Sequence, residues 1–425
     1  MKTILWPLLL MGLVPHHNSD AVAANLAPQA VSPETKEERD ARLNWWREAR
    51  FGMFIHWGPV TLKGTEISWS RGNPIPVEEY DNLYKEFNPT KFNAEEWVSV
   101  AKAAGMKYMV LTAKHWDGFC LWPTKTMDYH IGNSPFRRDV CGELAKAAHA
   151  AGIRLGWYYC PADLHDPDCK TDRNAAYIKR MQGQLTELLT DYRPVDLLWF
   201  DFAAPPEGSP WDQENTYRLV RKLQPKIIID NRLDMQTLAD YQAQRVGPNA
   251  DYYTPEQRIG AYDDQTPWET CMTLGTQWSW KPDDQIKSST ECLHILITCA
   301  SGDGNLLFNV GPMPTGEIEP RQVQRLKEMG EWLGKYGESI YGTRGGPFRN
   351  GAWGGATRKD KNVYLHVLKW ENDPLELPPL AAKIVSATVL TGGKAEVAQD
   401  DKHVIVQMPV DQRDKIDTII KLEVE

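Results

Sequence analysis

The most informative stretch of the chain is the apolar run from Val195 to Phe200, which ends on the carboxylate of Asp201. Short apolar runs bounded by turn residues are typical of strands that are buried on both faces, so we expect Asp201 at the carboxyl end of a strand. Trp199 lies two residues earlier and therefore points to the same side of that strand. A carboxylate beside an aromatic ring at a strand end suits chemistry on a sugar, although a strand-end aspartate also commonly caps a turn.

Two further carboxylates lie among aromatic residues later in the chain. Glu256 belongs to the irregular stretch from Asp251 to Gln257, and Glu269 belongs to the stretch from Pro267 to Thr273. Hydrolysis of a glycosidic bond needs one ionised carboxylate and one carboxyl group that carries a proton. Asp201 is the natural nucleophile because a strand end is rigid. Either Glu256 or Glu269 is then the natural acid.

Two histidines, His56 and His115, also come at or directly after the ends of apolar runs. No H-x-H, H-E-x-x-H or other metal-ligand spacing accompanies them, so we predict no metal site. We interpret them as neutral hydrogen-bonding partners for sugar hydroxyls, and a structural role in the core is the alternative. Glu66 adds a carboxylate close to Trp69 in a loop, where a glutamate is more often only solvated.

These side chains need a scaffold that brings strand ends together. Between residues 51 and 310, strand-like apolar runs alternate with amphipathic helical patterns, which predicts an α/β fold with a parallel sheet. Tyr158, Tyr159 and Arg232 also lie near the ends of such runs. Functional residues at many strand ends favour a (β/α)8-like barrel. A doubly wound sheet would usually carry a glycine-rich phosphate loop, which the sequence lacks.

The predicted organisation has four parts. Residues 1–24 are typical of a cleaved signal peptide, because Lys2 precedes the apolar stretch from Ile4 to Val14 and a small-residue site follows. Residues 25–36 form a polar linker, and residues 37–345 form the barrel, the predicted catalytic domain. Residues 346–425 contain short alternating runs separated by turn residues, which predict a small C-terminal antiparallel β-sandwich domain. We therefore expect a secreted or periplasmic protein, with an uncleaved anchor as the alternative.

Composition and net charge argue against some classes of binding partner. The chain has 425 residues, of which 42% are hydrophobic, and a formal net charge of -9, which argues against a nucleic-acid binder. No apolar stretch is long enough to span a membrane. The 17 Trp and 16 Tyr suit stacking against sugar rings as well as core packing. The seven cysteines show no metal spacing, and we expect most to be buried, with a bridge between Cys160 and Cys169 left open.

Together, six motifs give the chain a specific resemblance to a known family. They are F-G-M-F-I-H-W-G at 51–58, K-H-W-D-G-F at 114–119, L-W-F-D at 198–201, D-Y-Y-T-P-E-Q at 251–257, P-W-E-T-C-M-T at 267–273 and N-L-L-F-N-V-G-P at 305–312. From about Trp45 to Phe348, the chain resembles the α-L-fucosidases of glycoside hydrolase family 29. The resemblance implies a retaining exo-glycosidase that acts on fucosylated glycans without a metal or organic cofactor.

The resemblance also implies individual roles. Asp201 would be the nucleophile and Glu256 the acid/base, with Glu269 as the alternative acid/base. The implied substrate-binding residues are His56, Glu66, His115, Trp116, Tyr158, Tyr159, Trp199, Arg232 and Glu269. Trp116 stands where the family often has a second histidine, and Glu66 is followed by I-S-W where the family often has W-Y. These departures leave the roles of Glu66 and Trp116 open, and we interpret them as marks of the branch that prefers branched 1,3/1,4-linked fucose.

Two other classes of protein fit part of the pattern. A catalytically silent carbohydrate-binding protein on the same scaffold would keep the tryptophans and histidines, but it would not need matched carboxylates. The presence of both Asp201 and Glu256 argues against that class. A metal-dependent hydrolase would use the histidines, and the missing ligand spacing argues against it.

Overall fold

The computed structural model describes residues 34–205 and 211–425. The chain divides after Ala41 into two compact units, and α1 (Lys36–Ala49) begins in the first and ends in the second. All that follows concerns the second unit, residues 42–425. The predicted signal peptide and most of the predicted linker lie outside the described residues, and Lys36, at the end of that linker, is already helical.

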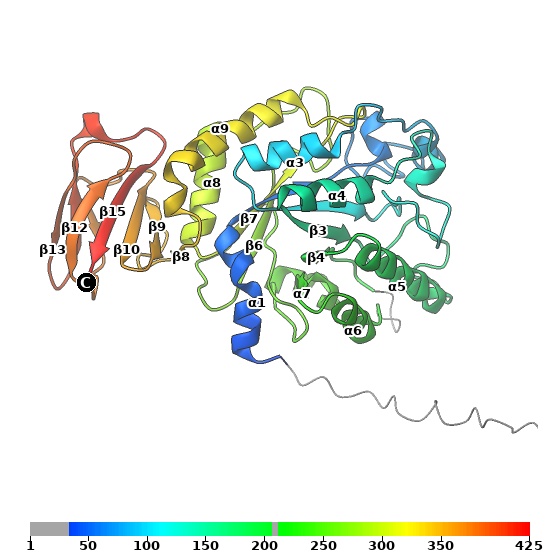
Figure 1. Ribbon diagram of the computed structural model, residues 1–425, viewed down its shortest axis with the longest axis horizontal. Coiled ribbons are helices and arrows are strands. Elements are labelled where there is room, and N and C mark those ends of the chain that lie inside the picture. Colours follow the sequence, from blue (N-terminus) through cyan, green and yellow to red (C-terminus); the bar gives the residue numbers. More distant parts are fainter. Residues whose placement is uncertain (1–33, 206–210) are drawn as a thin grey trace, which may run out of the picture. The chain divides into compact units, whose positions relative to one another are not determined.

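A parallel sheet of seven strands forms the centre of this unit (Figure 1). Its order is β5-β4-β3-β2-β1-β7-β6, so most neighbours in the sequence are also neighbours in the sheet. Almost every residue of these strands is buried, as expected when helices cover a parallel sheet. The strands are β1 (Phe51–Ile55), β2 (Tyr108–Lys114), β3 (Arg154–Tyr159), β4 (Leu197–Phe200), β5 (Ile228–Ile229), β6 (Glu269–Thr273) and β7 (Asn305–Val310).

The eighth position of the barrel is filled by the irregular stretch from Asp251 to Gln257. On one side, the Asp251 N–H donates to the carbonyl of Ile229 in β5 at 2.8 Å. On the other side, the Glu269 N–H of β6 donates to the carbonyl of Tyr253 at 3.0 Å, and the Gln257 N–H donates to the carbonyl of Cys271 at 3.0 Å. The stretch thus bridges the two edge strands, which closes the sheet into a barrel.

Helices run along the outer side of the parallel strands, and α4 illustrates how the sequence sets their limits (Figure 1). The Asp139 side chain accepts a hydrogen bond from the Gly142 N–H at 2.8 Å at the start, and Gly152 ends the helix with φ +70°. Val140 and Leu144 recur at helical spacing and are buried. The helices are α2 (Val77–Asn82), α3 (Ala94–Ala103), α4 (Val140–Ala151), α5 (Asn174–Thr190), α6 (Gln213–Leu223), α7 (Leu238–Ala243), α8 (Ser289–Ser301) and α9 (Pro320–Tyr336).

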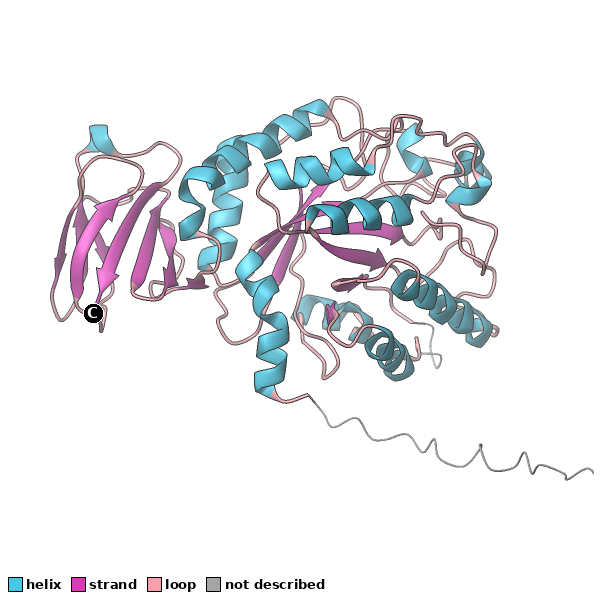
Figure 2. Cartoon of the chain, in the orientation of Figure 1, coloured by secondary structure: helices cyan, strands magenta, loops and turns pink. Residues whose placement is uncertain are grey.

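The C-terminal region forms two antiparallel sheets, which lie together in Figure 2. Their orders are β12-β15-β10-β9-β8 and β11-β14-β13. Apolar side chains of both sheets, among them Leu365, Val406 and Ile420, form a core of their own. The strands are β8 (Arg344–Gly345), β9 (Gly354–Lys359), β10 (Asn362–Val367), β11 (Leu375–Leu377), β12 (Ile384–Val389), β13 (Glu396–Gln399), β14 (Val404–Gln407) and β15 (Thr418–Val424).

The predicted fold class, a (β/α)8-like barrel followed by an antiparallel β domain, is confirmed. Within the described residues, no helix combines the length and the apolar character needed to cross a bilayer. All seven cysteines are free and six are buried, so Cys160 and Cys169 are not bridged.

Candidate active site

A pocket of about 430 Å³ opens at the carboxyl ends of the barrel strands. This volume suits one or two sugar rings. Its polar lining consists of His56, His115, Tyr158, Lys170, Asp201, Arg232, Tyr241 and Glu256. Its aromatic lining consists of Phe54, Trp69, Trp116, Trp199, Phe202 and Trp278.

Asp201 directly follows β4 and is held by three hydrogen-bond donors. The Tyr158 hydroxyl donates to Oδ2 at 2.5 Å, and the Arg232 Nη1 and the Phe202 N–H donate to Oδ1 at 2.8 and 2.7 Å. Burial and the neighbouring Asp201 charge raise the pKa of Tyr158 well above its ordinary value, so its hydroxyl remains a donor. The carboxylate of Asp201 is therefore fixed in orientation and neutralised by one cation.

Arg232 contacts a second carboxylate as well. Its Nη2 lies 3.0 Å from Glu256 Oε2, which also accepts a hydrogen bond from the Tyr241 hydroxyl at 2.8 Å. Trp199 covers the guanidinium at 4.3 Å, and the Arg232 Nε donates to the Thr254 hydroxyl at 2.8 Å. One buried guanidinium therefore holds the carboxylates of Asp201 and Glu256 on the same side of the pocket.

His56 lies just beyond β1 and faces the pocket from a fixed orientation. Its Nδ1 lies 2.6 Å from Asn309 Oδ1, while the Asn309 Nδ2 donates to the carbonyl of Trp278 at 2.7 Å. This network assigns the Nδ1 proton to His56 and leaves Nε2 as an acceptor. Burial, aided by nearby His115, lowers the pKa of His56 well below its ordinary value, so the ring is neutral at pH 7.

His115 follows β2 and is oriented by Ser68. The Ser68 hydroxyl lies 2.5 Å from the His115 Nδ1 and also accepts the Asp117 N–H at 2.8 Å. The hydroxyl therefore donates to Nδ1, which places the ring proton of His115 on Nε2. Burial and the adjacent Lys114 charge lower the pKa of His115 to about 3. The two histidines are thus both neutral, and they offer one acceptor and one donor.

Glu66 is absent from the lining of this pocket, because its carboxylate binds the backbone of the segment that carries Trp278. The N–H of Trp278 donates to Oε2 at 2.8 Å, and the N–H of Ser279 donates to Oε1 at 3.1 Å. Burial raises the pKa of Glu66, and these hydrogen bonds oppose that effect. The Trp278 ring packs on His56 with centroids 4.7 Å apart, so Glu66 positions a wall of the pocket.

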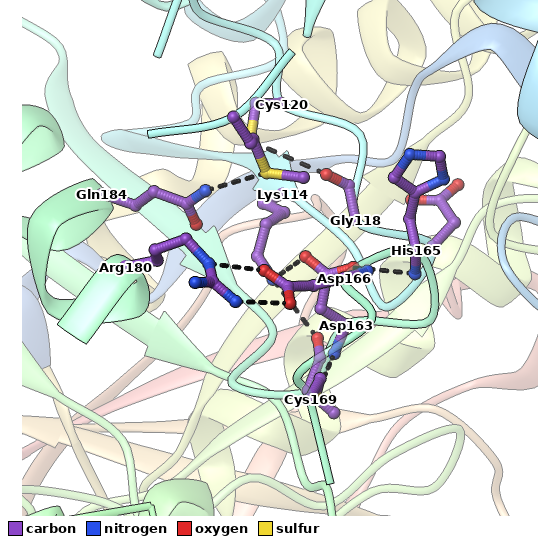
Figure 3. A network of polar contacts seen from close by, with 12 residues as sticks. Lys114, Gly118, Cys120, Asp163, His165, Asp166, Cys169, Arg180 and Gln184 are labelled. Atoms are coloured by element: carbon purple, nitrogen blue, oxygen red, sulfur yellow. Dashed lines mark hydrogen bonds and ion pairs between the residues drawn. The ribbon is translucent and has the colours of Figure 1, made fainter. Parts of the chain in front are cut away.

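Lys114 anchors the end of β2 directly before His115 (Figure 3). Its Nζ is fully buried and lies 3.1 Å from Asp163 Oδ2 and 3.2 Å from the Tyr177 hydroxyl. Burial alone would lower the pKa of Lys114, but the Asp163 charge raises it well above its ordinary value. Gly118 has φ +87°, and a Cβ there would lie 2.2 Å from Asp163 Oδ1. This ion pair therefore fixes the strand end that carries His115.

Comparison with known proteins places this site in a family. The family model described as Alpha-L-fucosidase matches residues 20–338. The chain belongs to the alpha-L-fucosidase family. A solved relative, alpha-L-fucosidase isoenzyme 1 from Paenibacillus thiaminolyticus, has a TM-score of 0.81 and 33% identity, over 91% of this chain and 99% of that one.

Two other similar proteins are also named as fucosidases. A fucosidase from Bacteroides thetaiotaomicron, solved as a trapped covalent intermediate with 2-fluoro-fucosyl fluoride, has a TM-score of 0.81 and 28% identity, over 91% of this chain and 96% of that one. Alpha-L-fucosidase 1 of Arabidopsis thaliana is 31% identical over 307 residues, which cover 67% of this chain. The match spans 58% of the length of the Arabidopsis protein.

The family's implied site residues fall into two groups in this structure. The pocket brings together His56, His115, Trp116, Tyr158, Trp199, Asp201, Arg232 and Glu256. Tyr159 points to the other side of β3, where its hydroxyl donates to Gln184 Oε1 at 2.6 Å. Glu66, as described, binds backbone behind the pocket wall.

Glu269 is the third residue that does not line the pocket. It is the first residue of β6 and points to the same side as Cys271, which does line the pocket, but one layer deeper in the barrel. Its carboxylate is fully buried and accepts hydrogen bonds from the Trp46 indole at 3.2 Å and from the Tyr108 hydroxyl. Burial raises the pKa of Glu269 to about 7.

Several residues of the site were not predicted from the sequence. Asn309 could have been found from the sequence, because it is a polar residue near the end of a buried strand, as Asp201 is. Tyr241 on α7 and Trp278 lie in loops and short helices, where no periodicity marks them. Within the residues that the structure describes, no group of three or more His, Cys, Asp or Glu is arranged to hold a metal ion.

Proposed function

We propose that this chain is a retaining, exo-acting α-L-fucosidase that removes terminal α-L-fucose from fucosylated glycans. The observation that carries the proposal is the bridging of Asp201 and Glu256 by Arg232 in a pocket of sugar size. Retaining glycosidases hold their two carboxyl groups about 5–5.5 Å apart, a spacing that one shared guanidinium allows. The covalent intermediate trapped in the Bacteroides relative supports the same reaction class.

In the first step, a carboxylate oxygen of Asp201 forms a bond to C1 of fucose while the bond from C1 to the leaving oxygen breaks. Glu256 transfers its proton to that leaving oxygen. As Asp201 becomes an ester it loses its negative charge. Arg232, which lies against both carboxyl groups, then faces the one carboxylate that remains charged.

In the second step, Glu256 takes a proton from water, the water oxygen bonds to C1, and the ester bond to Asp201 breaks. The returning charge on Asp201 is again met by Arg232 and by the Tyr158 hydroxyl. Two inversions at C1 give net retention. The neutral histidines, with one acceptor and one donor on the pocket side, are placed to bind sugar hydroxyls.

The reaction type is tested by proton NMR on hydrolysis of an aryl α-L-fucoside. The first-formed sugar should be α-L-fucose, and an initial β signal would contradict the proposal. Asp201→Gly should lose hydrolysis, and added azide should give β-fucosyl azide, because azide replaces the missing nucleophile. Glu256→Ala should give α-fucosyl azide, because azide then attacks the fucosyl-enzyme without needing a base. Binding of fucose without any turnover would instead favour a silent carbohydrate-binding protein.

We also propose that the enzyme prefers branched 1,3/1,4-linked fucose. The support is Trp116 and the I-S-W stretch after Glu66, which depart from the common family pattern. A panel of 1,2-, 1,3-, 1,4- and 1,6-linked fucosides tests this preference. The largest kcat/KM on a 1,2- or 1,6-linked substrate would rule it out.

We propose, finally, that the protein is exported and loses about its first 24 residues. The support is the charged, apolar and small-residue pattern at the start of the chain. N-terminal sequencing of the native protein tests this, and a retained Met1 in a cytosolic fraction would contradict it.

A further inference from the structure

Trp69 is a large aromatic side chain that the fold leaves in solvent. It is 66% exposed, and it is the one aromatic among the large apolar side chains that are exposed in the described part of the chain. It lies at the pocket with Trp116, and the two rings meet at 72° with centroids 5.3 Å apart. A ring that buries so little of its surface contributes little to folding, and its exposed face is open to a ligand at the pocket.

The backbone before Trp69 is held in an unfavourable conformation. Ser68 is buried and has φ +59°, a region that costs a non-glycine residue free energy. Its N–H donates to the Tyr80 hydroxyl at 2.8 Å, and its hydroxyl orients His115 at 2.5 Å. The position of Trp69 is therefore tied to a histidine of the pocket, and Trp116 directly follows that histidine. The two rings form a corner beside the sugar site.

We propose that Trp69 and Trp116 form the leaving-group subsite, where the apolar C–H face of the pyranose next to fucose stacks on the exposed face of Trp69. This inference rests on the proposed fucosidase activity and names the class of substrate that the enzyme recognises. Sugar rings present apolar faces that pack on aromatic side chains, and such contacts need no hydrogen-bond donors. Leu238 of α7, 61% exposed, adds further apolar surface to the same pocket.

The test compares two substrates that share fucose and differ in the leaving group. α-L-Fucosyl-(1,3)-N-acetylglucosamine places a pyranose in the subsite, whereas α-L-fucosyl fluoride places only a fluoride ion there. For Trp69→Ala, we expect kcat/KM on the disaccharide to fall by about 5- to 30-fold, as for loss of one stacking contact. With the fluoride, kcat/KM should stay at the wild-type value. Trp69→Phe, which keeps a ring, should recover most of the loss on the disaccharide.

Val385→Ala is the matched control, because Val385 is a similarly exposed apolar side chain on β12 of the C-terminal sheet, and kcat/KM on both substrates should be unaffected. Equal losses on both substrates for Trp69→Ala would overturn the subsite and leave the fucosidase activity standing, because Trp69 would then act through Ser68 and His115. A change in the molecular mass of the native particle on Trp69→Ala would also overturn it, because the ring would be a subunit contact. Failure of the wild-type enzyme to turn over either substrate would overturn both proposals.

Discussion

Glu269 is a buried group whose ionisation we expect to contribute to how stability changes with pH. Burial raises its pKa from 4.5 to about 7, while the hydrogen bonds from Tyr108 and Trp46 oppose this rise. The folded protein therefore keeps a proton on Glu269 at pH values where the unfolded chain has released it. This stabilisation is fully present below about pH 4.5 and is lost as the pH rises through about 7.

The size of the effect follows from the shift in pKa. A rise of about 2.5 units corresponds to about 3 kcal/mol, of which about 2–3 kcal/mol is lost between pH 5 and pH 8. Glu269→Gln has the same shape but cannot ionise. The variant should therefore gain about 2–3 kcal/mol over the wild type in free energy of unfolding when the pH is raised from 5 to 8. The cost of fitting an amide is the same at both pH values and cancels.

Urea unfolding of wild type, Glu269→Gln and the exposed control Glu371→Gln at pH 5 and pH 8 measures this difference. The control should track the wild type, because Glu371 lies on the surface. An unfolding difference between Glu269→Gln and wild type that does not change with pH would refute the reasoning. The same variant decides the alternative acid: on an aryl fucoside, turnover that azide raises with formation of α-fucosyl azide would make Glu269 the acid/base in place of Glu256.

Three further predictions follow from single contacts. Tyr158→Phe removes a donor from Asp201, so kcat/KM on an aryl fucoside should fall about 10- to 100-fold, and an unchanged rate would argue against this contact. Lys114→Met leaves Asp163 buried without its cation and should lower the free energy of unfolding by about 3–5 kcal/mol in urea, with partial recovery in the double variant Lys114→Met/Asp163→Leu. Glu66→Gln turns an amide donor toward backbone N–H groups, so KM should rise more than kcat falls; a loss confined to kcat would contradict a positioning role.

The order of strands and helices was largely predictable, because buried parallel strands leave continuous apolar runs. The eighth position of the barrel was not, because residues 251–257 use irregular backbone and the sequence shows no strand pattern there. The strand β6 was not predicted from the sequence for a different reason. Its sequence, from Glu269 to Thr273, carries polar residues that face the barrel interior, so it lacks the apolar run that marked β4.

The site was predictable where one strand end determines a residue's position, as for Asp201 and His56. The sequence did not show which of Tyr158 and Tyr159 lines the pocket. Strand alternation places one of two adjacent side chains there without indicating which one. Glu66 was misleading because its partners lie more than 200 residues away, and no local pattern reveals such a contact. Glu256 lies in the pocket and Glu269 lies deeper in the barrel, and the sequence does not encode this difference in depth.

The irregular closure of the barrel has a consequence for how far Asp201 and Glu256, the proposed nucleophile and acid/base, can each move along the sequence. Asp201 follows a strand paired on both sides, so an inserted residue before it would shift the whole ladder. Glu256 follows isolated backbone bridges, where an extra residue is absorbed as a bulge while the neighbouring strands keep their register. One carboxylate is thereby bound to a fixed place in the chain. Glu256 can therefore stand at different distances along the sequence and still occupy the same place in the pocket.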